Sequence, residues 1–211
     1  MKKLLPLILI AFIAFSCKGK TSQQSQSTDT TTEPAKTEFK AKGRYAIKSG
    51  IIEYKSMVMG MEAKQTTYFD DFGALEANET VMEMMGIKTA SITINRDGYV
   101  YTFDPEQKTG KKTVAYYGSN VNFEDLTDEI LKDWNLKKEG KETVVGKECE
   151  KWSMDNTTMG MKGYYWVYKG VPLKVDATMG SGKMQMDAIS FKENVEIPAG
   201  KLDIPSDIVF E

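Results

Sequence analysis

Residues 164–175 read YYWVYKGVPLKV, and they show most clearly the type of secondary structure that the chain is expected to form. Two runs of aromatic and β-branched residues, which favour strands, flank Lys169 and Gly170. A glycine between two such runs is typical of a tight turn. The pattern predicts a β-hairpin with strands over 161–168 and 171–179.

Similar short runs, separated by turn residues, fill the chain from Arg44 to its end. Asp97-Gly98 is a strong hairpin signal, and residues 99–103 alternate at the period of two that a strand shows. Strands recurring every ten residues or so predict a meandering antiparallel sheet. The other expected strands cover 45–58, 61–72, 73–85, 89–94, 141–145, 148–154 and 183–195.

One helix is expected between the strands. Phe123, Leu126, Ile130 and Trp134 recur at spacings of three and four, which places them on one helical face. A cap at Asn120 or Asn122 and acids in the first turn suit a helix start. The pattern predicts a helix over 122–134 that packs on one side of the sheet, followed by a Pro-punctuated tail along the sheet edge or over its open side.

The N-terminus has the outline of a secretory signal. Lys2 and Lys3 precede an uncharged apolar run that is too short to span a bilayer, and Ser16 and Cys17 close it. Residues 14–17, AFSC, resemble a bacterial lipobox, which implies cleavage before Cys17 and lipidation of its sulfur. The alternative is an ordinary signal peptide in which Cys17 is incidental.

The expected domains follow from this N-terminus. Residues 1–16 form the signal peptide, and residues 17–38 form the lipidated cysteine with a disordered tether. The tether is rich in Ser, Thr and Gln and has no aliphatic side chain larger than alanine, so it cannot bury enough surface to fold. Residues 39–211 form one domain of ordinary size.

Composition excludes several classes of function. The formal net charge of −2 becomes about −4 when the two signal lysines are removed, which argues against nucleic acid as a partner. Histidine is absent, so the usual catalytic triads and zinc sites are excluded, and we expect no enzyme and no cofactor. Once Cys17 is lipidated, Cys149 has no partner, and a buried inert thiol is favoured over a reactive one. The acids Asp70, Asp71, Glu76 and Glu79 are interpreted as solvated loop charges.

The second half of the chain resembles the lipoprotein-sorting factors of the LolA/LolB type. The hairpin at 164–175 looks like that family's strand, Gly-X-Pro-Leu turn and strand, and residues 204–210, IPSDIVF, look like its closing segment. Residues 189–195 then lead into Ile197-Pro198 as in that family. The resemblance implies a mainly β (α+β) fold: a single, strongly curved antiparallel sheet, or incomplete β-barrel, with one or two packed helices. It also implies a hydrophobic concave face that binds acyl chains.

The methionines are the second unusual feature. The chain has thirteen, and many lie two residues apart, a spacing that puts side chains on one face of a strand. Glycines beside them are typical of bends in a curved sheet. The expected ligand-binding residues are Met57, Met59, Met61, Met82, Met84, Met161, Trp166, Met184 and Met186.

Three interpretations of these residues compete. Methionine fills irregular gaps in a core, it re-packs around varied apolar ligands, and its thioether is a soft ligand for Cu(I). The favoured function is a membrane-anchored lipoprotein of the cell envelope, on the outer membrane, that binds a lipid or acyl chain. A structural or protein-interaction module with a filled core and a Cu(I)-binding protein are the alternatives.

Overall fold

The computed structural model describes residues 43–58, 60–115 and 121–211, which belong to one compact unit, Glu38–Glu211. The expected signal peptide, the lipidation site at Cys17 and the tether lie outside the described residues. In the described ranges no helix combines the length and the apolar character that crossing a membrane requires.

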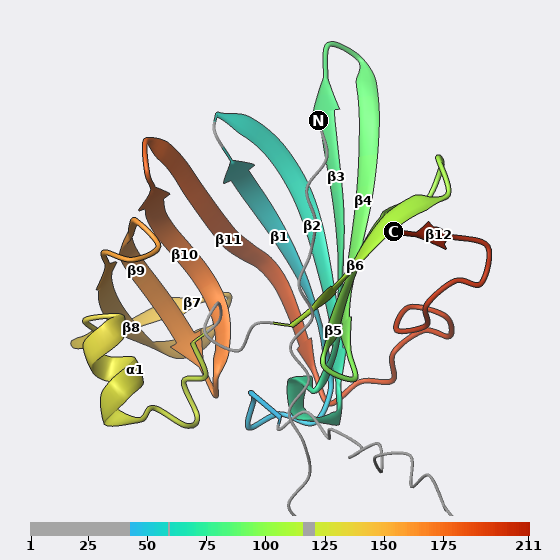
Figure 1. Cartoon of the computed structure of the whole chain (residues 1–211). Coiled ribbons are helices and arrows are strands. Elements are labelled where there is room, and N and C mark those ends of the chain that lie inside the picture. The colour runs from blue at the N-terminus through green and yellow to red at the C-terminus, as the bar shows by residue number, and fades with distance from the viewer. Residues whose placement is uncertain (1–42, 59, 116–120) are drawn as a thin grey trace, which may run out of the picture. The chain divides into compact units, whose positions relative to one another are not determined.

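Twelve strands form one open, curved sheet (Figure 1). Their order across the sheet is β12-β6-β5-β4-β3-β2-β1-β11-β10-β9-β8-β7. The expectation of a mainly β chain with a single curved antiparallel sheet is confirmed, and the sheet does not close into a barrel. The strands are β1 (Gly50–Val58), β2 (Met61–Asp70), β3 (Leu75–Met84), β4 (Ile87–Arg96), β5 (Tyr99–Asp104), β6 (Thr109–Val114), β7 (Lys137–Val144), β8 (Lys147–Asn156), β9 (Met161–Tyr168), β10 (Val171–Met179), β11 (Gly182–Glu193) and β12 (Val209–Phe210).

The chain builds this sheet from the middle in two meanders. Strands β1 to β6 run outward to one edge, and the chain then crosses through helix α1 (Asp128–Asp133) to the other edge. Strands β7 to β11 return to the middle, where β11 pairs with β1. Every pairing is antiparallel except that of β12 with β6. Residues far apart in the sequence therefore share one surface.

The hairpin at 164–175 forms as expected, with the bounds of β9 and β10 at the predicted residues. Lys169 and Gly170 have φ angles of 49° and 78°, the left-handed conformation that two-residue hairpin turns require. A bulge follows, because the register shifts between Pro172 and Lys174. Bulges increase the local bend of a strand.

The expected helix over 122–134 is wrong in its extent. Helix α1 covers only Asp128–Asp133, and Thr127 caps it by accepting a hydrogen bond from the Ile130 amide at 3.2 Å. The side chain of Asn122 instead accepts a bond from the Glu124 amide at 3.0 Å, which stabilises a turn. Asparagine favours such local turns as readily as helix caps. The apolar residues of the expected helical face still pack together.

Three clusters of buried side chains stabilise the sheet. One joins β1, β2 and β11 to the ends of β8–β10 nearest the Lys169-Gly170 turn. A second packs the 121–136 segment on β8–β11. The third covers β3–β5 with Leu202, Ile208 and Phe210 of the C-terminal segment. The expectation for the tail is thus met in both its forms, because this segment lies on the sheet and also ends as edge strand β12.

Candidate functional site

The candidate site is one face of the sheet, which we call the methionine face because Met61, Met82, Met184 and Met186 lie on it. Directly paired residues of antiparallel strands share a face. One row of such pairs crosses eight strands without interruption, from Trp152 on β8 to Thr89 on β4. Its members are Trp152, Tyr165, Val175, Met186, Ser56, Ala63, Met82 and Thr89.

A second row runs beside the first. It begins at Met154 on β8 and reaches Met61 on β2, and the backbone of Val58 on β1 links its last two members. The members are Met154, Gly163, Ala177, Met184 and Met61. Met154 is 2% exposed and Met61 is 40% exposed, so the end of the row on β2 is far more accessible than the end on β8.

Five of the nine expected ligand-binding residues belong to this face. Met161 on β9 follows Gly163 in phase and is buried. The residues that share the face are Met61, Met82, Met161, Met184 and Met186. Met59 and the side chain of Met84 lie outside what the structure describes.

The expectation of one common face is wrong for Met57 and Trp166. Met57 pairs with Gln185 and Glu62, one residue out of phase with the methionine face, so it lies on the opposite side of β1. Trp166 also lies on the opposite side, where its indole N–H donates to the Glu142 carboxylate at 2.7 Å. The turn between β1 and β2 breaks the i, i+2 pattern that was expected to unite Met57 with Met61.

The segment 121–136 covers the β8–β11 end of the methionine face. The ring of Phe123 packs against Trp152 and Tyr165, with centroids 6.0 and 5.5 Å away. Burial there raises the pKa of the Tyr165 hydroxyl to about 12. The same hydroxyl lies 3.9 Å from the Met161 sulfur. Aromatic rings and thioethers therefore form a continuous apolar layer under α1.

Small residues lie between the methionines at the centre of the face. Ser56, Ala63 and Ala188 are 6%, 4% and 7% exposed. Flexible thioether side chains on neighbouring strands cover such small residues well. The Ser56 hydroxyl is buried among these apolar neighbours, and no hydrogen-bond partner for it is present in the described part of the chain.

A polar network lies on the same face, near the turn that joins β2 to β3. The Thr67 hydroxyl lies 2.5 Å from the Asn78 side-chain oxygen, and the Asn78 amide donates to Glu76 at 3.0 Å. Gln65 joins the network through bonds to Thr67 and Asn78. Four polar side chains on adjacent strands thus hold one another in place.

Glu76 is the charged end of this network, and the expectation of a solvated loop charge is wrong for it. Its carboxylate accepts hydrogen bonds from Arg44 and from the Tyr45 hydroxyl, both at 2.6 Å. Glu76 itself is 7% exposed. The carboxylate raises the pKa of Arg44, and burial together with Glu76 raises the pKa of Tyr45. The sequence signal that was missed is the alternation of residues 76, 78 and 80 within a strand.

Cys149 is a buried free thiol, as expected. Burial raises the pKa of this thiol above its ordinary value, which keeps it protonated and unreactive.

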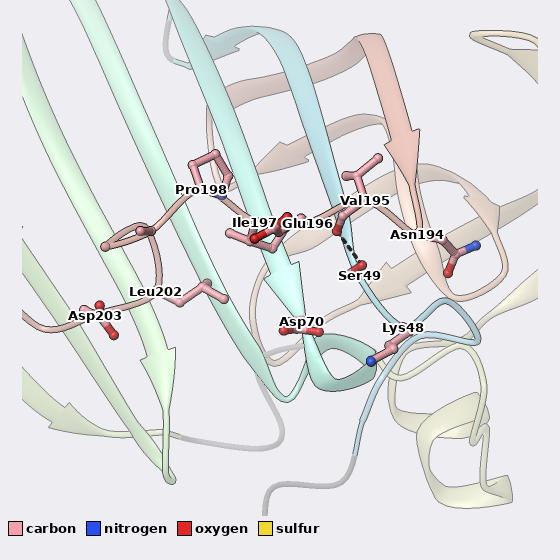
Figure 2. Close-up of a pocket in the computed structure, with 12 residues that line it drawn as sticks. Lys48, Ser49, Asp70, Asn194, Val195, Glu196, Ile197, Pro198, Leu202 and Asp203 are labelled. Carbon is pink, nitrogen blue, oxygen red and sulfur yellow. Dashed lines mark hydrogen bonds between the residues drawn. The ribbon is translucent and has the colours of Figure 1, made fainter.

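Four surface hollows are found among the described residues, and none of the four is lined by a methionine. Trp152 lines the edge of one of them and Ala63 the edge of another. The hollow in Figure 2, about 520 Å³, lies beneath the 194–203 segment. There the Ser49 hydroxyl donates to the Val195 carbonyl at 2.7 Å (Figure 2). Lys48, Asp70 and Asp203 make this hollow polar and charged, so it does not suit an apolar ligand.

Metal ligands of the common kind do not gather in the described ranges. No group of three or more Cys, Asp or Glu side chains there is placed to hold an ion. The thioethers on the methionine face are the soft ligands that remain.

Comparison with known proteins gives the fold. No protein-family model and no curated protein matches the chain by sequence. An uncharacterized conserved protein from Thermus thermophilus superposes with a TM-score of 0.54 at 13% identity, over 79% of this chain and 92% of its own. At such identity the match shows a shared fold alone.

Two further structures are more distantly similar. The matched chain of the Pseudomonas aeruginosa MucA/MucB complex gives a TM-score of 0.47 at 11% identity, over 75% of this chain and 56% of its own. A Vibrio parahaemolyticus domain assigned to outer membrane lipoprotein sorting gives 0.37 at 12% identity, over 76% and 92%. The Thermus thermophilus match supports, at the level of the fold alone, the single curved sheet that the sequence resemblance implied.

Proposed function

We propose that this chain is a non-enzymatic lipoprotein of the bacterial envelope, anchored to the outer membrane through Cys17, that binds an apolar ligand on its methionine face. The ligand is a lipid or an acyl chain. The observation that carries the proposal is the apolar layer that begins under α1 and becomes accessible toward Met61. A stable monomer gains little by leaving such a layer partly open to water.

The methionines give a physical route for binding. Each thioether side chain has three rotatable bonds and few polar constraints, so it can move aside and re-pack around a chain. The small residues Ser56, Ala63 and Ala188 then provide a floor on which an extended acyl chain can lie. Burial of each methylene contributes about 0.8 kcal/mol.

A structural or protein-interaction module is the second candidate. The observation that favours it is that the methionines fill space in this structure and line none of the four hollows. Cu(I) binding by the soft thioethers of the methionine face is a third candidate.

Native mass spectrometry of the full chain, released from detergent, tests the proposal. We expect a co-purifying mass in the range of a lipid, and we expect Met184→Gln to reduce its occupancy at least several-fold. Met57→Gln is the matched control, because it places the same substitution on the opposite side of the neighbouring strand. A chain that carries no lipid and takes up none from mixed micelles would support the filled core instead.

A further inference from the structure

The methionine face changes character between β11 and β5. Hydroxyl and amide side chains replace apolar ones over the middle of β2–β5, between Phe69 at one end and Met82 at the other, and we call them the polar block. These nine uncharged polar residues occupy consecutive pair positions on β2–β5. The polar block consists of Gln65, Thr67, Asn78, Thr80, Thr89, Ser91, Thr93, Asn95 and Thr102.

Charge is almost absent from the polar block. On this face of β2–β5 the charged side chains are Glu76 and Asp104. Glu76 is neutralised by Arg44, and Asp104 accepts bonds from the Glu106 and Gln107 amides of the following turn. Beyond the block, Lys111 on β6 is the next charged residue.

The opposite face of the neighbouring strands is built differently. Over β1–β4 it carries nine charged side chains, although its part on β3 and β4 also packs against the C-terminal segment. They are Glu53, Lys55, Glu62, Lys64, Asp70, Glu79, Glu83, Lys88 and Arg96. Neutral side chains are therefore characteristic of the polar block and not of this part of the sheet as a whole.

Several groups of the block have hydrogen-bonding capacity to spare. Thr80, Thr89, Ser91 and Asn95 make no side-chain hydrogen bond to any other described residue. Thr80 and Ser91 are direct cross-strand partners, so their hydroxyls lie side by side. Neutral donors and acceptors in such an array match hydroxyl-rich groups and supply no counter-ion to a charged one.

Ser56 supplies a second, independent observation at the boundary of the two regions. Its hydroxyl is unpartnered among the described residues although Ser56 is only 6% exposed, and it lies between Met186 and Ala63 in the row that reaches Met82. A buried hydroxyl without a partner costs free energy unless a ligand satisfies it. An ester or amide oxygen at the head of an acyl chain would do so.

We infer that the ligand is an amphiphile with an uncharged, hydroxyl-bearing head group, which lies on the polar block while its acyl chain lies among the methionines. The ester or amide group that joins the head group to the acyl chain accepts a hydrogen bond from the Ser56 hydroxyl. This inference rests on the proposed function and adds the chemical class of the head group.

Three probes with the same dibrominated stearoyl chain test it on the full chain: a monoacylglycerol, its phosphate and the methyl ester. Bromine quenches tryptophan fluorescence at short range, and Trp134 and Trp152 lie at the apolar end of the methionine face. We expect the monoacylglycerol to bind more tightly than its phosphate and the methyl ester, by about 2- to 10-fold for each hydrogen bond gained.

A matched pair of variants locates the head group. Thr80→Val combined with Ser91→Ala removes two free hydroxyls of the polar block, while Thr66→Val makes a similar change on the opposite face of β2. We expect the double variant to lose the preference for the monoacylglycerol and to bind the methyl ester unchanged, and we expect the control to behave as the original chain. Equal binding of all three probes, or an unchanged preference in the double variant, would overturn the inference while leaving the proposed function standing. Failure of every probe to bind would overturn both.

Discussion

The two faces of β1–β5 use the same backbone and face very different surroundings. The face opposite the methionines carries charged side chains and supports the C-terminal segment, whose Leu202, Ile208 and Phe210 pack on Ala77, Ile94 and Phe103. The methionine face has thioethers, small residues and neutral polar groups, and its one buried carboxylate among the described residues is fully paired. The difference is what the proposed function requires, since the apolar ligand is proposed to bind the face that carries few charges.

Glu76 and Glu79 on β3 test this contrast most strongly. We expect Glu76→Ala to lower the free energy of unfolding by about 3–5 kcal/mol, because it leaves the largely buried Arg44 without its counter-ion. Glu79→Ala, which breaks the more exposed pair with Lys201 on the opposite face, is expected to cost about 1 kcal/mol or less. Urea unfolding of both variants measures the difference. Equal losses would contradict the division between the faces.

Alkaline pH tests the apolar layer under α1. Burial raises the pKa of Tyr165 to about 12, so the unfolded chain loses this proton near pH 10 while the folded chain retains it. The stabilisation is therefore fully present below about pH 10 and is lost as the pH rises toward 12, by up to about 2–3 kcal/mol. Thermal unfolding measured from pH 8 to 12 gives the melting temperature at each pH. This temperature should fall less steeply with pH in Tyr165→Phe than in the original chain. Identical slopes would show that Tyr165 is hydrated in the folded chain.

Ser56 should show opposite effects on stability and on binding. Ser56→Ala removes a buried hydroxyl without a partner among the described residues, and we expect it to raise the free energy of unfolding by about 1 kcal/mol. The same change should weaken binding of an ester-linked acyl chain by about 2- to 10-fold. Denaturant unfolding and fluorescence titration measure the two quantities. A destabilised variant would mean that the hydroxyl is already hydrogen-bonded in the folded chain.

The smallest effect on stability is expected from an ion pair on the face opposite the methionines. Lys55 and Glu62 form an ion pair at 3.5 Å, and both side chains are about two-thirds exposed. Lys55→Gln should change the free energy of unfolding by less than about 0.5 kcal/mol. It should also leave acyl binding unchanged, since both residues lie on the side away from the methionines. A clear loss of binding would indicate that the ligand binds the face of Lys55 and Glu62, which would contradict the proposed function.

The fold was largely predictable because its signals are local. The alternation in 161–179 and the Lys169-Gly170 turn give β9 and β10 to the residue. Helix α1 was overestimated because spacing alone does not reveal that Asn122 and Thr127 divide the apolar run into a turn and a short helix.

The site was predictable only in part because it depends on register. Spacing two residues apart correctly places Met184 and Met186 on one face of β11. It cannot tell that the turn after Val58 moves Met57 to the other face, or that Glu76 meets Arg44, 32 residues away. The polar block was missed for the same reason, since its members come from four strands and form a pattern only once the strands are paired.

Photocross-linking with an acyl chain that carries a diazirine near its end tests the central claim most directly. After irradiation of the full chain, peptide mapping should place the adducts on the methionine face, at Met184, Met186, Met82 and their neighbours. Unlabelled monoacylglycerol should compete them away. Adducts concentrated at Met57 and the rest of the face opposite the methionine face, or in the hollow beneath residues 194–203, would contradict the account.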